Sequence, residues 1–177
     1  IENFSYNLYS SEKKYLDNSG NLLAITVEDA SGNVFSSWTA SYDDRGNMLS
    51  ETRAGNLTGA FTNILQVNAQ GQPLNGESAT VKYTYTYHPV NNPGDTFNLL
   101  TSKTEPNGKV TRYQYDPATA KLTVVFVCQP DSTPDDPLDN PIYTRTFNDY
   151  NQYGVLIRTL TDDGTSTVKT DITGVSE

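Results

Sequence analysis

Few side chains in this sequence have types suited to catalysis. His88 is the single histidine and Cys128 the single cysteine among the 177 residues. A nucleophilic cysteine needs a neighbouring base, so a reactive pair would have to join these two residues across a long stretch of chain. We interpret His88 as a loop residue beside Pro89 and Cys128 as a core residue of a strand. The sequence therefore predicts no enzyme, and no disulfide bond within the chain.

A cluster of aspartates is the next candidate, for a calcium site. Residues 129–141 form a Pro/Asp-rich stretch that contains Asp131, Asp135, Asp136 and Asp139. Ca²⁺ takes six to eight oxygen ligands, but this stretch lacks the alternating aspartates of a calcium loop, and its prolines restrict convergence. We expect an exposed loop at 129–141, with no metal and no cofactor.

Other acidic pairs have a structural explanation. Asp43-Asp44 and Asp162-Asp163 fall in predicted turns, where an aspartate commonly binds its own backbone. A glycosidase needs two carboxylates facing one cleft, and nothing in this spacing asks for that arrangement.

Three tyrosines are candidates for binding. Tyr83, Tyr85 and Tyr87 alternate with Lys82, Thr84 and Thr86, which we expect on the opposite, solvated face of a strand. Such a tyrosine face is suited to stacking on carbohydrate or to contacting a protein. Tyrosines on a strand also serve core packing and cross-strand pairing, so both interpretations stay open.

The overall charge disfavours two classes of partner. The chain has 12 Lys+Arg against 21 Asp+Glu, a net charge of −9 and a pI near 4.5. That sign repels phosphate backbones and anionic lipid surfaces, so we expect no nucleic acid partner. No apolar run approaches the roughly 20 residues of a membrane helix, so we expect no membrane insertion.

Short strands and turns have to position these side chains. Period-two alternation of apolar and polar residues, interrupted by Gly, Asn and Asp, predicts an all-β fold of consecutive antiparallel hairpins without helix. The strand at 122–128 is apolar on both faces, so we expect it to be covered on both sides. Alternation predicts a half-buried strand within 1–14, further strands at 22–27, 34–42, 61–67, 79–87, 99–103, 110–115 and 122–128, and a last repeat unit over 142–160. Residues 165–177 alternate only weakly.

One layout recurs roughly every 25 residues: an aromatic strand end, an Asp turn, then the start of the next strand. A hairpin alone cannot bury its apolar face, whereas stacked hairpins make a continuous sheet. The residues that carry the layout are Tyr15, Asp17 and Gly20, then Tyr42, Asp43 and Gly46, then Tyr113, Tyr115, Asp116 and Leu122.

This layout resembles the YD repeat of RHS (rearrangement hotspot) proteins. The resemblance is strongest at residues 113–122 and covers most of the chain. It implies one YD/RHS-repeat β domain over 1–177, as a curved open segment of an RHS shell. Since the chain begins at Ile1 rather than Met, we expect it to be a piece of a longer protein.

The resemblance also implies a function. RHS shells of bacterial proteins enclose or present a C-terminal toxin or effector, so the expected partner is that domain or the rest of the parent chain. The expected location is secreted or on the cell surface. The shell's autoproteolytic closing segment and a toxin domain have no counterpart in this sequence. A carbohydrate- or protein-binding adhesion module is the alternative, and strand pairing at a sheet edge predicts a homodimer.

Overall fold

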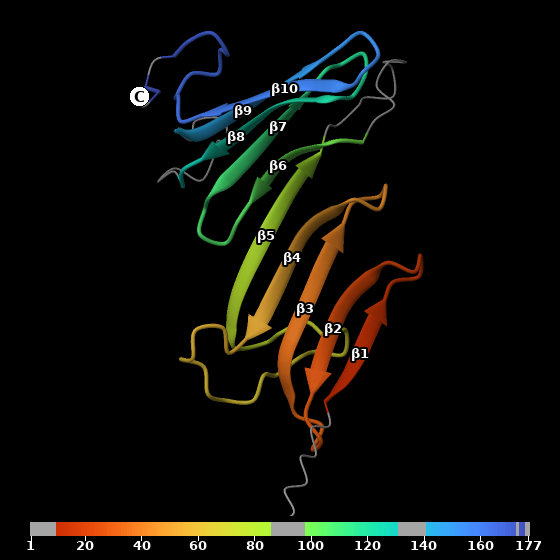
Figure 1. Cartoon of the computed structure of the whole chain (residues 1–177). Coiled ribbons are helices and arrows are strands. Elements are labelled where there is room, and N and C mark those ends of the chain that lie inside the picture. The colour runs from red at the N-terminus through yellow and green to blue at the C-terminus, as the bar shows by residue number, and fades with distance from the viewer. Residues whose placement is uncertain (1–9, 86–97, 131–140, 173, 176–177) are drawn as a thin grey trace, which may run out of the picture. The chain divides into compact units, whose positions relative to one another are not determined.

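The computed structural model describes residues 10–85, 98–130, 141–172 and 174–175. These residues form ten strands and no helix, which confirms the all-β prediction (Figure 1). The strands are β1 (Ser11–Leu16), β2 (Leu22–Glu28), β3 (Val34–Tyr42), β4 (Met48–Gly55), β5 (Glu77–Tyr85), β6 (Leu100–Thr104), β7 (Val110–Tyr115), β8 (Leu122–Cys128), β9 (Ile142–Tyr150) and β10 (Leu156–Asp162).

The ten strands form one open antiparallel sheet in which each strand lies beside its neighbours in chain order. This confirms the prediction of consecutive hairpins. By its internal contacts the chain divides into two compact units, residues 1–81 and 82–177. The expectation of one repeat domain over the whole chain stays a prediction.

The predicted strands at 34–42, 110–115 and 122–128 have the observed bounds, but the strand predicted at 61–67 is wrong. The segment 56–76 makes a single isolated bridge, between Val67 and Pro73. It runs from the C-terminal end of β4 to the N-terminal end of β5, and these two ends lie at the same end of the sheet (Figure 1). Of its apolar residues, Leu65 is buried, whereas Leu57, Ile64 and Leu74 are exposed.

Segment 56–76 packs on the β1–β4 sheet of the first unit. Leu65 is buried, and its backbone N–H donates to the Val34 carbonyl at 3.1 Å. The Ser37 hydroxyl donates to the Gly71 carbonyl at 2.8 Å. A Cβ atom at Gly71 would lie 2.6 Å from the Tyr15 ring, so only glycine lets the chain approach this closely. The segment thus covers part of one face of this sheet, as a second layer would.

The second unit has a larger apolar core. Its buried residues are Val110, Phe126, Cys128, Ile142 and Phe147. The rings of Phe126 and Phe147 meet edge to face, with centroids 6.3 Å apart. Cys128 is fully buried, as a core residue should be.

The two faces of β8 differ in burial. Phe126 and Cys128 are buried, whereas Val125 and Val127 on the other face are half-buried. The expectation that β8 is covered on both sides therefore holds for one face only. Among the described residues, the segment after β10 folds back over the core side, where Arg145 binds it.

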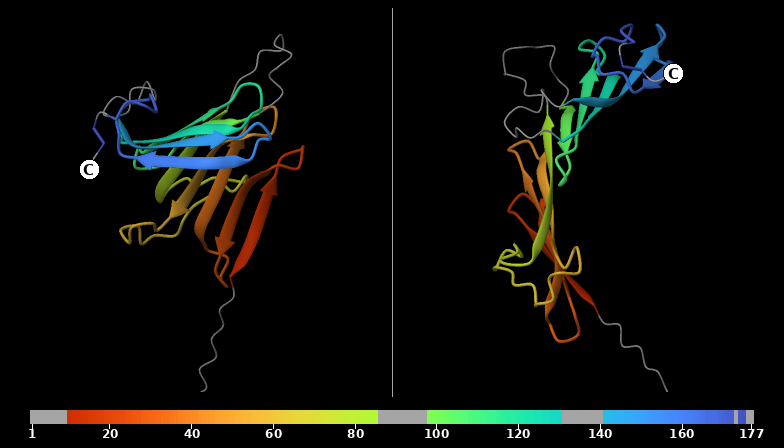
Figure 2. Two further views of the ribbon diagram at one scale, coloured as in Figure 1. Left: turned by 45° about the horizontal axis from the view of Figure 1, so that its top comes forward. Right: turned by 90° about the vertical axis from the view of Figure 1, so that its left-hand side faces the viewer.

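Arg145 on β9 holds that C-terminal segment in place. Its side chain is fully buried and donates to both Asp162 carboxylate oxygens and to the carbonyls of Ser166, Val168 and Asp171. All five guanidinium N–H groups are thereby used. Figure 2 shows the segment after β10 lying beside β9 and β10. No strand forms in the described part of 165–177, where the sequence predicted weak alternation. The hydrogen bonds of Arg145 hold this segment against the sheet instead.

Several sequence predictions lie outside the described residues. They are the strand residues 1–9, the loop residues 86–97 with His88, and residues 131–140 of the Pro/Asp-rich stretch. Among the residues that the structure describes, no helix has the length and apolarity needed to span a membrane.

We predict that Arg145→Lys lowers the free energy of unfolding by about 2–4 kcal/mol, because an ammonium group has three donors and leaves buried carbonyls or Asp162 without a partner. Urea unfolding monitored by fluorescence measures the loss. Arg53→Lys is the control, since Arg53 is exposed, and should change stability by less than about 0.5 kcal/mol. Equal effects of the two substitutions would contradict the assigned role of Arg145.

Candidate functional site

The corners between strands are the repeated feature of the chain, and the first runs from Asp17 to Asn21. The Asp17 N–H donates to the Asn21 carbonyl at 2.9 Å, and the Gly20 N–H donates to the Asp17 carbonyl at 3.1 Å. Gly20 has a φ of 86°, which glycine adopts without strain. One carboxylate oxygen of Asp17 accepts from the N–H groups of Ser19 and Asn21, and the other accepts from the Asn21 side chain, all at 2.8 Å.

The same bonding recurs at Asp43–Asn47, at Asp29–Asn33 and, with asparagine in place of aspartate, at Asn68–Gln72 and Asn151–Val155. At the first two of these four, the side-chain amide of the closing Asn donates to the aspartate's second oxygen. The sequence predicted a turn at Asp29 but did not count it as a copy of the repeat. Its Asp-x-x-Gly-Asn spacing, identical to that at Asp17, was the available signal.

The corner at Asp116 departs from the others. It is one residue longer, since the Asp116 N–H donates to the Lys121 carbonyl at 2.8 Å. Ala120 has a φ of 57° where the other corners have glycine. Thr119 replaces the closing asparagine, and both its N–H and its hydroxyl donate to the Asp116 carboxylate. The resemblance placed the best copy of the motif here, yet this corner has the least usual backbone.

These hydrogen bonds lower the pKa of the corner aspartates. The chief cause is the Asn21 side chain for Asp17, the Asn33 backbone for Asp29, the Asn47 side chain for Asp43 and the Thr119 side chain for Asp116. Each bond favours the ionised carboxylate. The corners are therefore built for charged aspartate at neutral pH.

A tyrosine hydroxyl joins the end of one strand to the start of the strand before it. Tyr42 donates to the Leu22 carbonyl at 3.0 Å, Tyr115 to the Leu100 carbonyl at 2.9 Å and Tyr150 to the Leu122 carbonyl at 2.9 Å. Each tyrosine is the last residue of its strand, and each leucine is the first residue of the preceding strand. Burial raises the pKa of Tyr115, with a smaller contribution from Tyr113, so its hydroxyl keeps its proton for this bond.

The motif residues predicted from the sequence thus have separate roles. Tyr42, Tyr115 and Leu122 form these tyrosine–carbonyl bonds, whereas Asp17, Gly20, Asp43, Gly46 and Asp116 form the corners. Tyr15 packs against Gly71. Tyr113 lies opposite Val125 on the half-buried face. The partners missed by the sequence are Leu22, Leu100 and Tyr150; the pairing of Tyr150 with the Asn151 corner was the signal that could have found the last of them.

Two of the three tyrosines of the predicted binding face lie within the described residues. Tyr83 and Tyr85 are half-buried on β5, and Tyr87 lies outside the described residues. Lys82 and Thr84 are exposed as expected, although their face becomes the buried core farther along the sheet, at Phe126. Register links Tyr83 through Lys103 and Thr111 to Val127, so these four residues share the face opposite that core.

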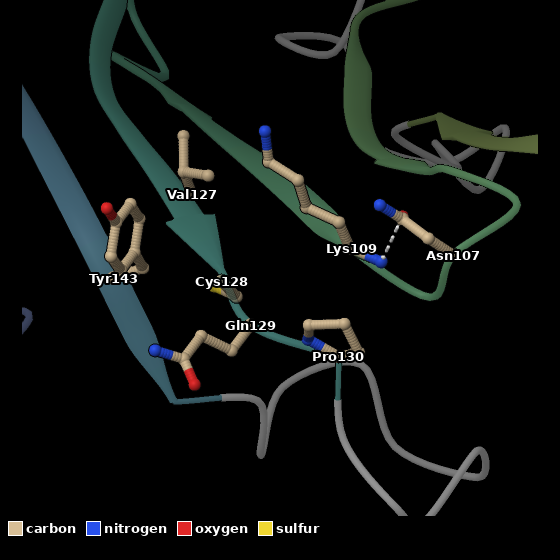
Figure 3. A pocket seen from close by; sticks show the side chains of 7 residues that line it. All are labelled: Asn107, Lys109, Val127, Cys128, Gln129, Pro130 and Tyr143. Atoms are coloured by element: carbon tan, nitrogen blue, oxygen red, sulfur yellow. Dashed lines mark hydrogen bonds between the residues drawn. The ribbon is translucent and has the colours of Figure 1, made fainter.

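A shallow groove of about 280 Å³ lies where that face meets the end of β8 (Figure 3). Val127, Lys109 and Tyr143 point to the same side of the sheet in this view, and the Tyr143 side chain is 60% exposed. Asn107, Cys128, Gln129 and Pro130 complete the lining. An exposed ring beside polar side chains suits a sugar or a peptide. Within the described residues, no group of three or more His, Cys, Asp and Glu is placed to hold a metal.

Comparisons with known proteins point to one family. Residues 94–124 match the family model of the RHS repeat. The comparison with curated proteins found no match. The crystal structure of TcdB2-TccC3-TEV is similar to this chain with 11% sequence identity and a TM-score of 0.32, over 89% of this chain and 11% of that chain. The family-model match includes the motif at residues 113–122 and confirms the resemblance to the RHS repeat for that part of the chain.

We predict that Tyr115→Phe lowers the free energy of unfolding by about 0.5–1.5 kcal/mol, because it removes the hydroxyl and leaves the Leu100 carbonyl without that donor. Chemical denaturation measures this. Tyr153→Phe is the matched control, since Tyr153 is 82% exposed. A loss as large in the control would show that the hydroxyl of Tyr115 contributes nothing specific.

We also predict that acid destabilises the protein through the corners. A carboxylate whose folded pKa is lowered stabilises the fold above its ordinary pKa of 3.8, and this contribution is lost as the pH falls through the lowered value. The urea midpoint should therefore be level near neutrality and fall below about pH 4.

The matched control for the acid prediction is a triple variant in which Asp17, Asp29 and Asp43 are replaced by Asn. Asn68 and Asn151 show that asparagine supports the same turn. The variant should fold and lose part of its acid sensitivity. An unchanged dependence on pH would sink the assignment.

Proposed function

We propose that this chain, an RHS repeat protein, is a non-catalytic wall segment of a β-shell that encloses or presents a C-terminal toxin or effector. The observation that carries the proposal is the bond from a tyrosine hydroxyl to the first carbonyl of the preceding strand. It occurs three times, at Tyr42, Tyr115 and Tyr150. A sheet that is extended by repeats needs a contact between adjacent strands that can recur in each repeat.

The chemistry of the sheet supports a passive role. Each corner aspartate uses its carboxylate to hold its own turn, so these acids are structural groups rather than proton donors for a substrate. The face that carries Tyr83, Tyr113 and Val127 combines half-buried aromatic and apolar side chains with threonines. Such a surface suits broad, weakly specific contact with a cargo chain. A shell with that task belongs to a secreted or surface-exposed protein.

A second candidate function is a carbohydrate- or protein-binding adhesion module. The exposed Tyr143 ring in the groove supports it, because aromatic rings flanked by amide side chains are suited to stacking on sugars. The groove opens on the same face as the proposed cargo surface. One experiment can therefore separate the two functions.

The test labels tyrosines with a soluble reagent in the full-length parent protein, with and without its C-terminal domain. We expect the cargo to protect Tyr143, which is 60% exposed in this chain, and to leave Tyr153, at 82%, labelled in both forms. Equal labelling of Tyr143 in the two forms would contradict enclosure. Glycan-array binding that Tyr143→Ala abolishes would favour the adhesion module instead.

A further inference from the structure

The two faces of the β1–β4 sheet differ in burial. Ala24 and Ser37 are buried on the face against which segment 56–76 packs. Ile25 and Trp38 lie at the alternating positions, on the other face, and are half-buried. Their face is therefore the one on which a partner can still bury apolar side chains.

One row of side chains, the cross-strand row, crosses this half-buried face. Strand register places Lys14 of β1 opposite Ile25 of β2. It also places Ile25 opposite Trp38 of β3, and Trp38 opposite Arg53 of β4. Paired residues point to the same face of a sheet, so the order along the row is cation, aliphatic, indole, cation. The two ends of the row are three strand spacings apart, about 14 Å.

The cations at the two ends are available to a ligand. Lys14 and Arg53 are both exposed, and neither makes a hydrogen bond or ion pair with another described residue. The acids nearest to them on this face are Glu12, two residues before Lys14, and Glu51, which already accepts a hydrogen bond from Trp38. On a chain with a net charge of −9, two such cations in one row favour an anionic ligand.

Trp38 provides a fixed apolar surface at the centre of the row. Its Nε1–H group donates to the Glu51 carboxylate at 2.9 Å, which satisfies the indole donor and fixes the plane of the ring. Its neighbours along β3 on the same face are Ser36 and Ala40, both with small side chains. The indole is therefore the main apolar contact that β3 offers on this face.

The aliphatic side chains of β2 favour a polypeptide over a sugar. Leu23, Ile25 and Val27 are half-buried on the same face as Trp38. A sugar ring can stack on the indole alone, whereas an apolar side chain also gains free energy by burying the aliphatic groups beside it. An extended polypeptide covers about 14 Å in about four residues. The matching segment therefore has an apolar centre and a carboxylate at each end.

We propose that the cross-strand row binds an acidic polypeptide segment with an apolar centre. The apolar residues of the segment lie on Ile25 and Trp38, and its carboxylates meet Lys14 and Arg53. Such a segment comes from the cargo of the proposed shell, so this contact rests on the proposed function and adds a surface chemistry for the cargo.

The experiment uses Trp38 as the reporter, because it is the only tryptophan of the chain. Three short peptides share a centre of leucine and valine and carry glutamate, glutamine or lysine on both sides of it. The glutamate peptide should shift the Trp38 emission to shorter wavelength in a saturable titration. The other two peptides should bind about tenfold more weakly or less, because they lack charges that complement the two cations.

A charge reversal tests the role of Arg53. Arg53→Glu should weaken binding of the glutamate peptide by about tenfold or more and strengthen binding of the lysine peptide. Arg158→Glu is the matched control, since Arg158 is an exposed arginine of the second unit, and it should leave the titration unaltered. Urea unfolding checks that both variants fold, and the comparison of the three peptides on the wild type needs no variant.

Four outcomes would overturn the proposal: equal binding of the three peptides, no binding of any, an equal loss in Arg158→Glu, or a shift produced by an oligouronate and by no peptide. The last would show that the row takes an acidic sugar instead. Tyrosine labelling of the parent protein is a separate readout. Protection of Tyr143 by the cargo together with no peptide binding would refute this contact and leave enclosure standing.

Discussion

A tyrosine hydroxyl bound to the first carbonyl of the preceding strand is the contact on which the sheet depends. In a sheet made of consecutive hairpins, a slip of one residue moves every side chain to the other face. Within one hairpin, the Asp-x-x-Gly corner fixes the register by its own hydrogen bonds. The bonds of Tyr42, Tyr115 and Tyr150 fix the opposite ends of the strand pairs β2–β3, β6–β7 and β8–β9.

The local part of this architecture could be predicted from the sequence. The corner at Asp43–Asn47 and the strands at 34–42, 110–115 and 122–128 follow from spacing and alternation, because turn chemistry acts over four or five residues. Glycine and asparagine are typical turn residues, so the sequence alone identifies these turns.

The long-range part could not be predicted in the same way. Residues 61–67 alternate like a strand, yet Leu65 is buried against the β1–β4 sheet and the segment covers a face. The role of Arg145 could not be predicted, because the carbonyls that it binds belong to residues more than 20 positions away in the sequence. They are the carbonyls of Ser166, Val168 and Asp171. The partner of each tyrosine depends on strand order, which a pattern along one strand does not contain.

The connections between strands differ in a way that bears on how such chains diversify. Connections that leave β1, β3, β7 and β9 are short corners, and the last three begin directly after a tyrosine bound to the preceding strand. Connections that leave even-numbered strands carry no such bond among the described residues, and the segment 56–76 is one of them. Extra sequence can therefore enter after an even strand without altering the spacing of the joints. Duplication and insertion in a gene of this kind can act independently, one adding strands to the sheet and the other lengthening a connection between strands.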